Sequence, residues 1–164
     1  MYKNQGYLSD EEVAELFPSQ ERLEQGMVAI IECVQNIPCN PCQDACPRHA
    51  ILPFAVMTDN PVMDHNLCNG CGLCIGSCPG LAIFVLHLNY TDSTSLIKIP
   101  YEMLPVPEPD QMVEIFSRSG HNIGSGKVKK VQTLKHNPKT RIVWVEIPKE
   151  LYKSARSIRV VNHD

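Results

Sequence analysis

The sequence predicts an α+β protein with a short N-terminal helical arm, a small cysteine-rich α+β domain, and a small, barrel-like β-rich domain at the C-terminus. Three observations predict this organisation. All eight cysteines lie within residues 33–78, in two groups. Short apolar runs rich in β-branched residues recur after residue 95, as in a small all-β domain. The formal charge is −11 over residues 1–116 and +8 over residues 117–164, which favours units with different neighbours.

The helical arm is expected over residues 1–26. Ser9 and Glu12 have the spacing of a capping box, and apolar residues follow at helical intervals. Pro18 and Gly26 are expected to end two short helices. We expect this arm to pack over the cysteine-rich domain and to take no part in catalysis.

The cysteine-rich domain is expected over residues 27–90. Its first segment, MVAIIE, and its last segment, AIFVLHLNY, are apolar enough to form buried strands. Between them we expect a hairpin from residues 55–57 and 62–63, and one helical turn after each Cys-Pro pair. These elements predict a duplicated β-α-β unit folded as an α+β sandwich.

The second cysteine group carries the more specific motif. The run CNGCGLCIGSCPG has the spacing C-x2-C-x2-C-x3-C-P and contributes Cys68, Cys71, Cys74 and Cys78. This spacing is typical of cysteines that hold a cubane [4Fe–4S] cluster, and in proteins with two such clusters the fourth cysteine binds the other one. The glycines between the cysteines let the backbone curl around a cube and bring N–H groups to its sulfurs. The motif therefore predicts a second cluster, with its other ligands upstream.

The first cysteine group supplies those ligands. Cys39, Cys42 and Cys46, with a proline after the last, match the C-x2-C-x3-C-P part of the motif. Cys33 lies three residues further upstream than the motif requires, which we interpret as an insertion. The segments CNPC and CPRHAI recur as CNGC and CPGLAI, which indicates an internal duplication. The predicted ligands are, for cluster 1, Cys33, Cys39, Cys42 and Cys78, and for cluster 2, Cys46, Cys68, Cys71 and Cys74.

The sequence leaves alternatives to two four-iron clusters. If Cys33 is a free buried thiol, the first site holds a three-iron cluster or is damaged. Zinc sites favour two C-x2-C pairs separated by a long gap, and three cysteines within seven residues followed by Cys-Pro fit that pattern poorly. Disulfides suit small secreted domains, whereas this N-terminus is polar and acidic without the apolar core of a signal peptide. No apolar stretch approaches the ~20 residues that span a bilayer. We therefore expect a cytoplasmic protein outside the membrane. Because such clusters are sensitive to oxygen, we expect an anaerobic setting.

The remainder of the chain divides into a Pro-rich linker or strap over residues 91–110 and a basic β-rich domain over residues 111–164. Trp144 and Tyr152 are the only aromatic residues of the +8 segment, so it lacks the aromatic and basic interleaving of a nucleic-acid stacking surface. We expect its lysines and arginines to be solvated or to contact an acidic protein surface. Strands are expected at residues 96–99, 112–116, 128–134, 142–147 and 158–161, turns at 117–126 and 135–140, and a helical turn within 148–153.

Residues 27–90 resemble the two-cluster ferredoxins of the bacterial type, through the complete motif and its partial repeat. More narrowly, the segments ECVQNIPCNPCQDACP and DHNLCNGCGLCIGSCPGLAIF resemble the small iron–sulfur subunit of anaerobic, multi-subunit, flavin-dependent amino-acid dehydrogenases, including those that act on proline or hydroxyproline. This resemblance implies a hetero-oligomer in which flavoprotein dehydrogenase subunits carry FAD, or FAD and FMN.

The cysteine motif and the resemblance together predict an electron-transfer subunit of an oxidoreductase complex rather than an enzyme by itself. A flavin takes two electrons from a substrate and can pass them singly to clusters. One alternative is an iron–sulfur nucleic-acid-binding or regulatory protein, which the +8 segment supports. The other is a free ferredoxin-like carrier, against which the added arm and the β-rich domain argue.

Overall fold

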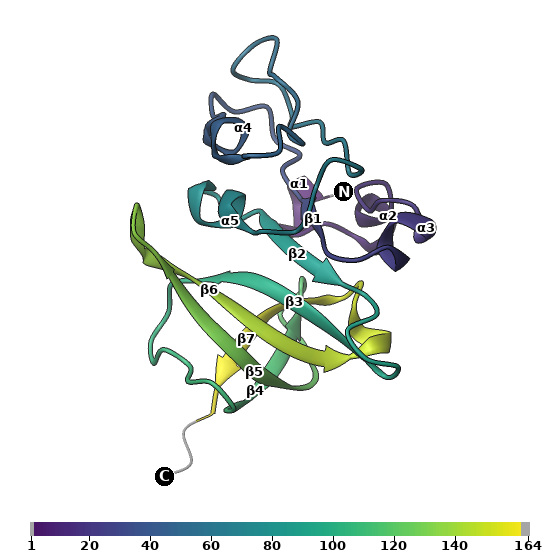
Figure 1. The fold of residues 1–164 in the computed structure, drawn as a ribbon, viewed down its shortest axis with the longest axis vertical. Helices are drawn as coiled ribbons and strands as arrows, with labels where there is room; N and C mark the ends of the chain where they lie inside the picture. Colours follow the sequence, from purple (N-terminus) through teal and green to yellow (C-terminus); the bar gives the residue numbers. More distant parts are fainter. Residues whose placement is uncertain (1, 162–164) are drawn as a thin grey trace.

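The computed structural model describes residues 2–161 and shows one antiparallel sheet beneath a cap of short helices and loops (Figure 1). The order of the seven strands across the sheet is β1-β2-β3-β6-β5-β4-β7. The strands are β1 (Val28–Ile31), β2 (Ile83–His87), β3 (Thr94–Tyr101), β4 (Met112–Ser117), β5 (Asn122–Leu134), β6 (Asn137–Pro148) and β7 (Ala155–Val160). The helices are α1 (Tyr2–Gln5), α2 (Asp10–Ala14), α3 (Gln20–Glu24), α4 (Pro41–Ala45), α5 (Leu73–Ser77) and the 3-10 helix η1 (Lys149–Leu151). The predicted α+β class is therefore confirmed.

The sheet joins the cysteine-rich segment to the C-terminal segment. β1 pairs with β2, and β2 also pairs with β3, where Val85 lies opposite Lys98. β3 in turn pairs along its whole length with β6. Backbone pairing thus runs across residue 90 without a break, because part of the expected linker at residues 91–110 forms β3.

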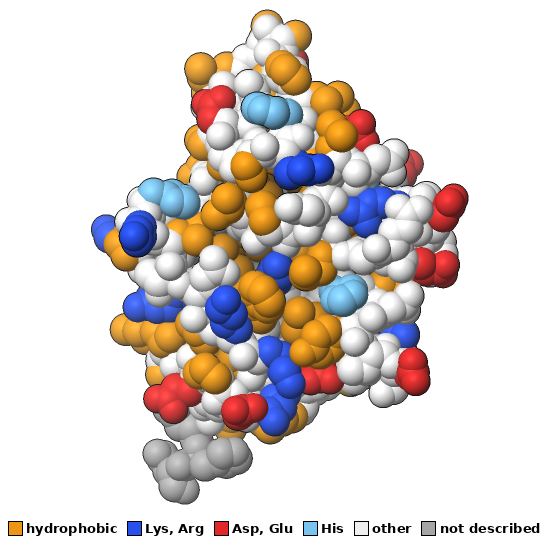
Figure 2. Space-filling model, viewed as in Figure 1, with side chains coloured by type: hydrophobic (Ala, Val, Ile, Leu, Met, Phe, Trp, Pro, Cys, Tyr) orange, Lys and Arg blue, Asp and Glu red, His pale blue; other side chains and the backbone are white. Residues whose placement is uncertain are grey.

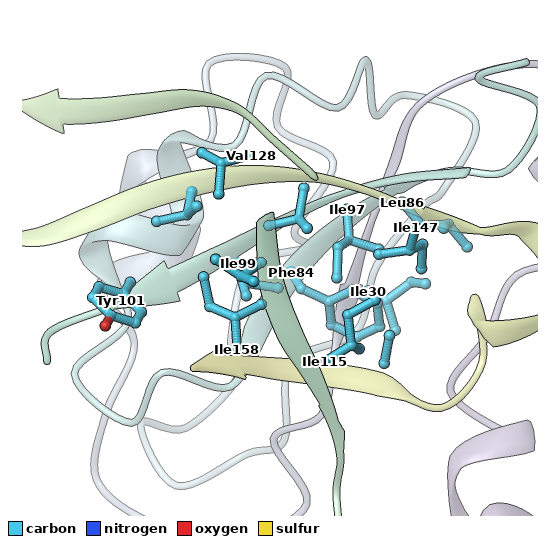
Figure 3. Close-up of a cluster of buried hydrophobic side chains, with 14 of the residues drawn as sticks. Ile30, Phe84, Leu86, Ile97, Ile99, Tyr101, Ile115, Val128, Ile147 and Ile158 are labelled. Carbon is cyan, nitrogen blue, oxygen red and sulfur yellow. The ribbon is translucent and has the colours of Figure 1, made fainter. Parts of the chain in front are cut away.

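The main core fills the curled inner face of this sheet. Side chains from all seven strands point into it, and Ile30, Phe84, Ile97, Ile115 and Ile147 are among those with at most 1% of their surface exposed (Figure 3). Alternate residues of β1, β2, β3, β4 and β6 supply most of these side chains, as the two-residue period of a β-strand requires. Burial of each such isoleucine or phenylalanine stabilises the fold by roughly 1.5–3 kcal/mol relative to an exposed position.

The sheet is curled but not closed, which corrects the expected barrel-like domain. Within residues 2–161, β1 and β7 are the two edges and share no backbone ladder. Side chains connect these edges instead. Arg156 on β7 donates a 3.1 Å hydrogen bond to Glu32, directly after β1. Phe17 of the N-terminal arm packs against Phe84 and Tyr152, with ring centroids 6.1 and 6.3 Å away.

A second core lies on the other face of the sheet, against the cysteine loops. Ala29 and Ile31 are buried on this face of β1, while their neighbours Val28 and Ile30 belong to the main core. Both faces of β1 are therefore covered, as in a central strand. The buried members of the second core are Ala29, Ile31, Ile51, Cys74, Ile75, Ile83, Val85, Leu134 and Ile142. Through this core, α5 and the cysteine loops pack on the sheet.

The N-terminal arm has the predicted capping box. The Glu12 amide donates to the Ser9 hydroxyl at 3.3 Å, and the Ser9 amide donates to the Glu12 carboxylate at 2.9 Å. α2 and α3 are the two short helices expected, and α1 precedes them without a signal that we recognised. No helix in the described part of the chain is long and apolar enough to cross a bilayer.

Two predictions for the cysteine-rich segment were wrong. The expected hairpin between residues 55–57 and 62–63 is absent from the described structure, where Met63 instead forms a single antiparallel bridge with Ile51. The helical turns precede each Cys-Pro pair instead of following it, since α4 ends before Cys46 and α5 before Cys78. A residue that precedes proline avoids the helical conformation. Accordingly Cys46 and Cys78 are extended, with ψ of 104° and 109°, and each helix stops there.

The predicted apolar runs of the C-terminal segment lie in strands β3 to β7, except that the last run extends one residue past the end of β7, and η1 lies within the expected helical turn. The turns are shorter than predicted, because β5 begins at Asn122 and β6 at Asn137. Gly126 explains part of this difference. A Cβ atom at this position would lie 2.8 Å from the Glu146 carbonyl oxygen, so its glycine permits close strand packing rather than marking a turn.

Candidate iron–sulfur site

The eight cysteine thiols fall into two groups in space. Cys42 has Cys78, Cys33 and Cys39 as its electrostatic neighbours. The corresponding neighbours of Cys74 are Cys68, Cys71 and Cys46. Cys78 thus joins the first motif and Cys46 joins the second, which is the crossed grouping that a two-cluster domain requires. The structure brings all eight predicted residues into these two groups, and their role as ligands stays a prediction.

Burial makes the inner thiols poor acids before metal binds. It raises the pKa of Cys74 to about 12, with a further rise from the neighbouring thiols. It likewise raises the pKa of Cys42 to about 11, again with neighbouring thiols adding to the shift. Cys71, by contrast, is exposed. Since metal binds the thiolate, assembly of a cluster here releases protons.

A hollow lies within the second thiol group. Four thiols line it, together with the apolar side chains of Ala29, Ile51 and Met63 and the polar side chains of Arg48 and Asn69; the thiols are those of Cys46, Cys68, Cys71 and Cys74. Four thiols around one hollow form the donor set of a [4Fe–4S] cluster, so these residues fit the group that the motif predicts. Among residues 2–161, no three His, Cys, Asp or Glu side chains converge on a single-ion site.

The loop that carries Cys68 depends on Gly70. Gly70 has a φ of +69°, and its amide donates to the Cys68 sulfur at 3.3 Å. A Cβ atom at this position would lie 2.3 Å from Cβ of Met27. The Ala29 amide of β1 donates to the same sulfur at 3.4 Å. Such N–H bonds stabilise a negatively charged sulfur and help to set a cluster's potential.

The internal repeat is visible in the backbone after each Cys-Pro pair. His49 and Leu81, three residues after Cys46 and Cys78, have left-handed φ angles of 51° and 52°. Each donates its amide to the carbonyl of its cysteine, at 3.1 and 3.2 Å. The next amide then donates to the cysteine sulfur, at 3.3 Å in the first repeat and 3.4 Å in the second. The two motifs are therefore duplicates in geometry as well as in sequence.

Arg22 of the arm fixes the second cysteine loop from outside the motif. It is 8% exposed, and its guanidinium donates to the carbonyls of Cys68 at 2.7 Å and His65 at 2.8 Å. It also donates to the carbonyls of Gly26 and Met27. The arm therefore positions a cysteine loop as well as covering it. The sequence offers no signal for this role, because Arg22 lies in an ordinary charged helix.

Lys98 of β3 reaches the same loop from the sheet. Its Nζ donates to the Gly70 carbonyl at 2.7 Å and lies 4.0 Å from the centroid of the Trp144 ring. Lys98 is only 2% exposed, and burial lowers its pKa. We did not single it out from the sequence, although a lone lysine within the apolar run SLIKIP is a usable signal.

A buried ion-pair network holds the residue that directly precedes the first cysteine. Glu32, which directly precedes Cys33, pairs with Arg118 at 2.5 Å and with Arg156 at 3.1 Å. The exposed fractions of these three side chains are between 7% and 11%. Arg156 also lies 3.9 Å from the centroid of the Phe84 ring. The network ties the chain just before the first cysteine to β7 and to the residue after β4.

Comparison with known proteins supports an iron–sulfur domain. A family model described as "4Fe-4S binding domain" matches residues 61–84, which contain Cys68, Cys71, Cys74 and Cys78. The chain is 40% identical over 57 residues to the ferredoxin-type protein NapF of Escherichia coli strain K12. It is also 40% identical over 61 residues to the ferredoxin-type protein NapF of Haemophilus influenzae.

These similarities are confined to part of each protein. They cover 34% and 36% of this chain and 35% of each relative, so the chain matches about a third of their length. No solved structure matches the chain. Residues 61–84 therefore form a [4Fe–4S]-binding domain of the ferredoxin type, the kind of domain that transfers single electrons.

Proposed function

We propose that this protein relays single electrons through two [4Fe–4S] clusters, as a subunit of a flavin-dependent oxidoreductase complex. Cluster 1 would be held by Cys33, Cys39, Cys42 and Cys78, and cluster 2 by Cys46, Cys68, Cys71 and Cys74. The observation that carries the proposal is the crossed grouping of the thiols, in which each motif lends its last cysteine to the other. When bound, each cluster would accept and release one electron at a time.

The chain's own residues provide what such a relay needs. The crossed cysteines fix both sites within one small unit, since α4 and α5 pack against each other. The second core keeps water from Cys74, which is 7% exposed, while Cys71 remains exposed as a route to a partner. Amides of Ala29, Gly70 and Ala82 donate to cysteine sulfurs and would stabilise the reduced state.

Exposed apolar side chains around the cysteine loops support a subunit rather than a free carrier. Six large ones lie within residues 37–67, and Figure 2 shows hydrophobic side chains over the upper part of the molecule, where the cap lies. Val62 is 61% exposed, and Val56 and Met57 are 57% and 55% exposed. Apolar surface of this kind marks contact sites for other proteins. In the proposed complex it would contact a flavoprotein subunit that carries FAD, and the sequence resemblance suggests an amino-acid dehydrogenase.

Anaerobic purification from the native cell tests the proposal. We expect the chain to elute with larger polypeptides, and the pool to contain FAD as well as iron and sulfide. Addition of the substrate of those polypeptides should bleach the iron–sulfur absorbance near 400 nm. Quantitative recovery of the iron-loaded chain as a monomer free of flavin would leave a ferredoxin-type carrier and refute the subunit role.

A further inference from the structure

We propose that two buried cations, Lys98 and Arg22, hold cluster 2 at a higher reduction potential than cluster 1. The inference rests on the proposed pair of clusters and adds which of the two has the higher reduction potential. An electron shared by the two sites would then reside mainly at cluster 2. Lys98 makes the larger contribution to the potential of cluster 2, and Arg22 adds to it in the same direction.

Lys98 brings its charge to cluster 2 from the sheet below. It lies on β3 between Val85 and Trp144 of the neighbouring strands. The hydrogen bond from its Nζ ends on Gly70, which stands between Cys68 and Cys71 in the sequence. The thiols of Cys71, Cys68 and Cys74 are all electrostatic neighbours of this ammonium group. Three of the four cysteines of cluster 2 therefore lie near one fixed positive charge.

Arg22 places a second charge at the same loop. Its 2.7 Å hydrogen bond ends on the carbonyl of Cys68 itself. In the described part of the chain, neither Lys98 nor Arg22 pairs with a carboxylate. Both charges are therefore buried without an opposite charge, apart from the one that the cysteines and their cluster would carry.

The thiols of cluster 1 have different neighbours. The electrostatic neighbours of Cys33 and of Cys42 are other thiols of the same group, with no cation among them. Two buried cations thus lie at the loop of cluster 2, and no cation neighbours Cys33 or Cys42. A four-iron cluster gains one negative charge on reduction, so the site with more buried positive charge favours the reduced form. Water and salt screen such buried charges weakly.

A redox titration monitored by EPR tests this ordering in the cluster-loaded protein. The wild type should show two one-electron steps. In Lys98→Met, which removes the charge and keeps an unbranched side chain, the step of higher potential should fall. We expect the equilibrium constant for this step to change at least tenfold, which corresponds to ~59 mV for one electron. The other step should move less.

Two matched variants separate charge from structure. Lys98→Arg keeps the charge and should leave the higher step within a few-fold of the wild type. Lys130→Met removes an equal charge from an exposed side chain that lies 4.9 Å from the same Trp144 ring, and both steps should stay in place. Thermal unfolding of the loaded variants checks that the clusters and the fold are retained.

The outcomes distinguish this inference from the proposed function. If the wild type takes up no clusters, or takes up only one electron in total, the two-cluster relay itself is wrong. If it takes up two electrons in a single step, the two clusters have equal potentials and the proposed ordering is overturned. If it shows two steps and Lys98→Met leaves the higher one unchanged, lowers only the other, or lowers both equally, the relay stands and the proposed ordering is overturned. Should Lys98→Met fail to load, Arg22→Met supplies the same comparison with the same expected direction.

Discussion

Gly70 shows how single residues near the second thiol group serve several contacts at once. Its left-handed backbone aims one amide at the Cys68 sulfur and its carbonyl at the Lys98 ammonium. Its missing side chain leaves room for Met27. Because all three contacts lie around the second thiol group, substitutions of Gly70 should affect cluster 2 more than the remainder of the fold.

The first prediction concerns Gly70→Ala. The new methyl group would overlap Cβ and the backbone carbon of Met27, at 2.3 and 2.9 Å, and would sit at an unfavourable φ of +69°. We expect anaerobically assembled Gly70→Ala to lose about half of its iron, because cluster 2 fails to form. Gly80→Ala is the matched control, since a Cβ atom there meets no heavy atom within 4 Å. Equal iron in both variants would contradict the assigned role of Gly70.

The second prediction concerns pH. Burial holds the pKa of Cys42 near 11 and that of Cys74 near 12, so both thiols are protonated in the metal-free protein at neutral pH. Each must lose its proton to bind iron, so apparent iron affinity should rise with pH, by up to about tenfold per thiol for each pH unit below these values. Chelator competition under anaerobic conditions, at about pH 7 and about pH 8.5, measures this rise. A flat response, after correction for the chelator's own protonation, would contradict it.

The third prediction concerns the carboxylate at Glu32. Glu32→Gln removes the negative charge from a buried network and leaves Arg118 and Arg156 facing each other. Removal of one partner from a buried pair costs about 3–5 kcal/mol, so we expect a loss of that size in denaturant unfolding of the loaded protein. The control is Glu114→Gln, whose partner Arg159 is 67% exposed, with an expected loss of about 0–1 kcal/mol. Similar losses in the two variants would contradict the account.

At the scale of elements, the β5–β6 hairpin connects the sheet to α5. Asn137 donates from its side-chain amide to the carbonyl of Gly76 at 2.9 Å. Leu134 packs so closely on the same glycine that a Cβ atom there would lie 2.3 Å from its Cδ1. The hairpin therefore supports the helix that carries Cys74. In this way the C-terminal segment helps to hold the second thiol group in place.

The fourth prediction concerns the packing of Leu134 against α5. Leu134 is 6% exposed and belongs to the second core, so Leu134→Ala should lower the free energy of unfolding by about 2–5 kcal/mol. It should also speed the loss of iron to a chelator, since α5 loses its support. Leu104→Ala serves as the control, because Leu104 is 84% exposed and its loss should leave both measurements unchanged. An iron-release rate unchanged in Leu134→Ala would show that the hairpin does not support the site.

Local patterns in the sequence were sufficient for most elements and for the grouping of the cysteines. The capping box at Ser9 and the apolar runs of strands β1 to β7 depend on near neighbours, and the structure contains them. The helical turns were misplaced because the effect of a proline on the preceding residue was overlooked at Cys46 and Cys78. The sequence marks Lys98 as a lone lysine in an apolar run, but it identifies no partner for Lys98 or Arg22, since their contacts with the cysteine loop join residues 28 and 46 positions apart.

At the scale of the whole molecule, the cysteine-rich segment and the β-rich segment share one sheet and one main core. Phe84 and Ile30 from the first segment pack with Ile115 and Ile158 from the second. The buried cations at the second cysteine loop come from the arm and from β3. The additions beyond a minimal two-cluster unit therefore form part of the surroundings of proposed cluster 2.

The most direct test of this account is the count of iron and acid-labile sulfide in anaerobically reconstituted wild-type protein. Two crossed sites predict about eight irons and about eight sulfides per chain. A count near four of each would mean that only one thiol group holds a cluster, and a count near zero would mean that neither does. Either of these results would contradict the two-cluster relay.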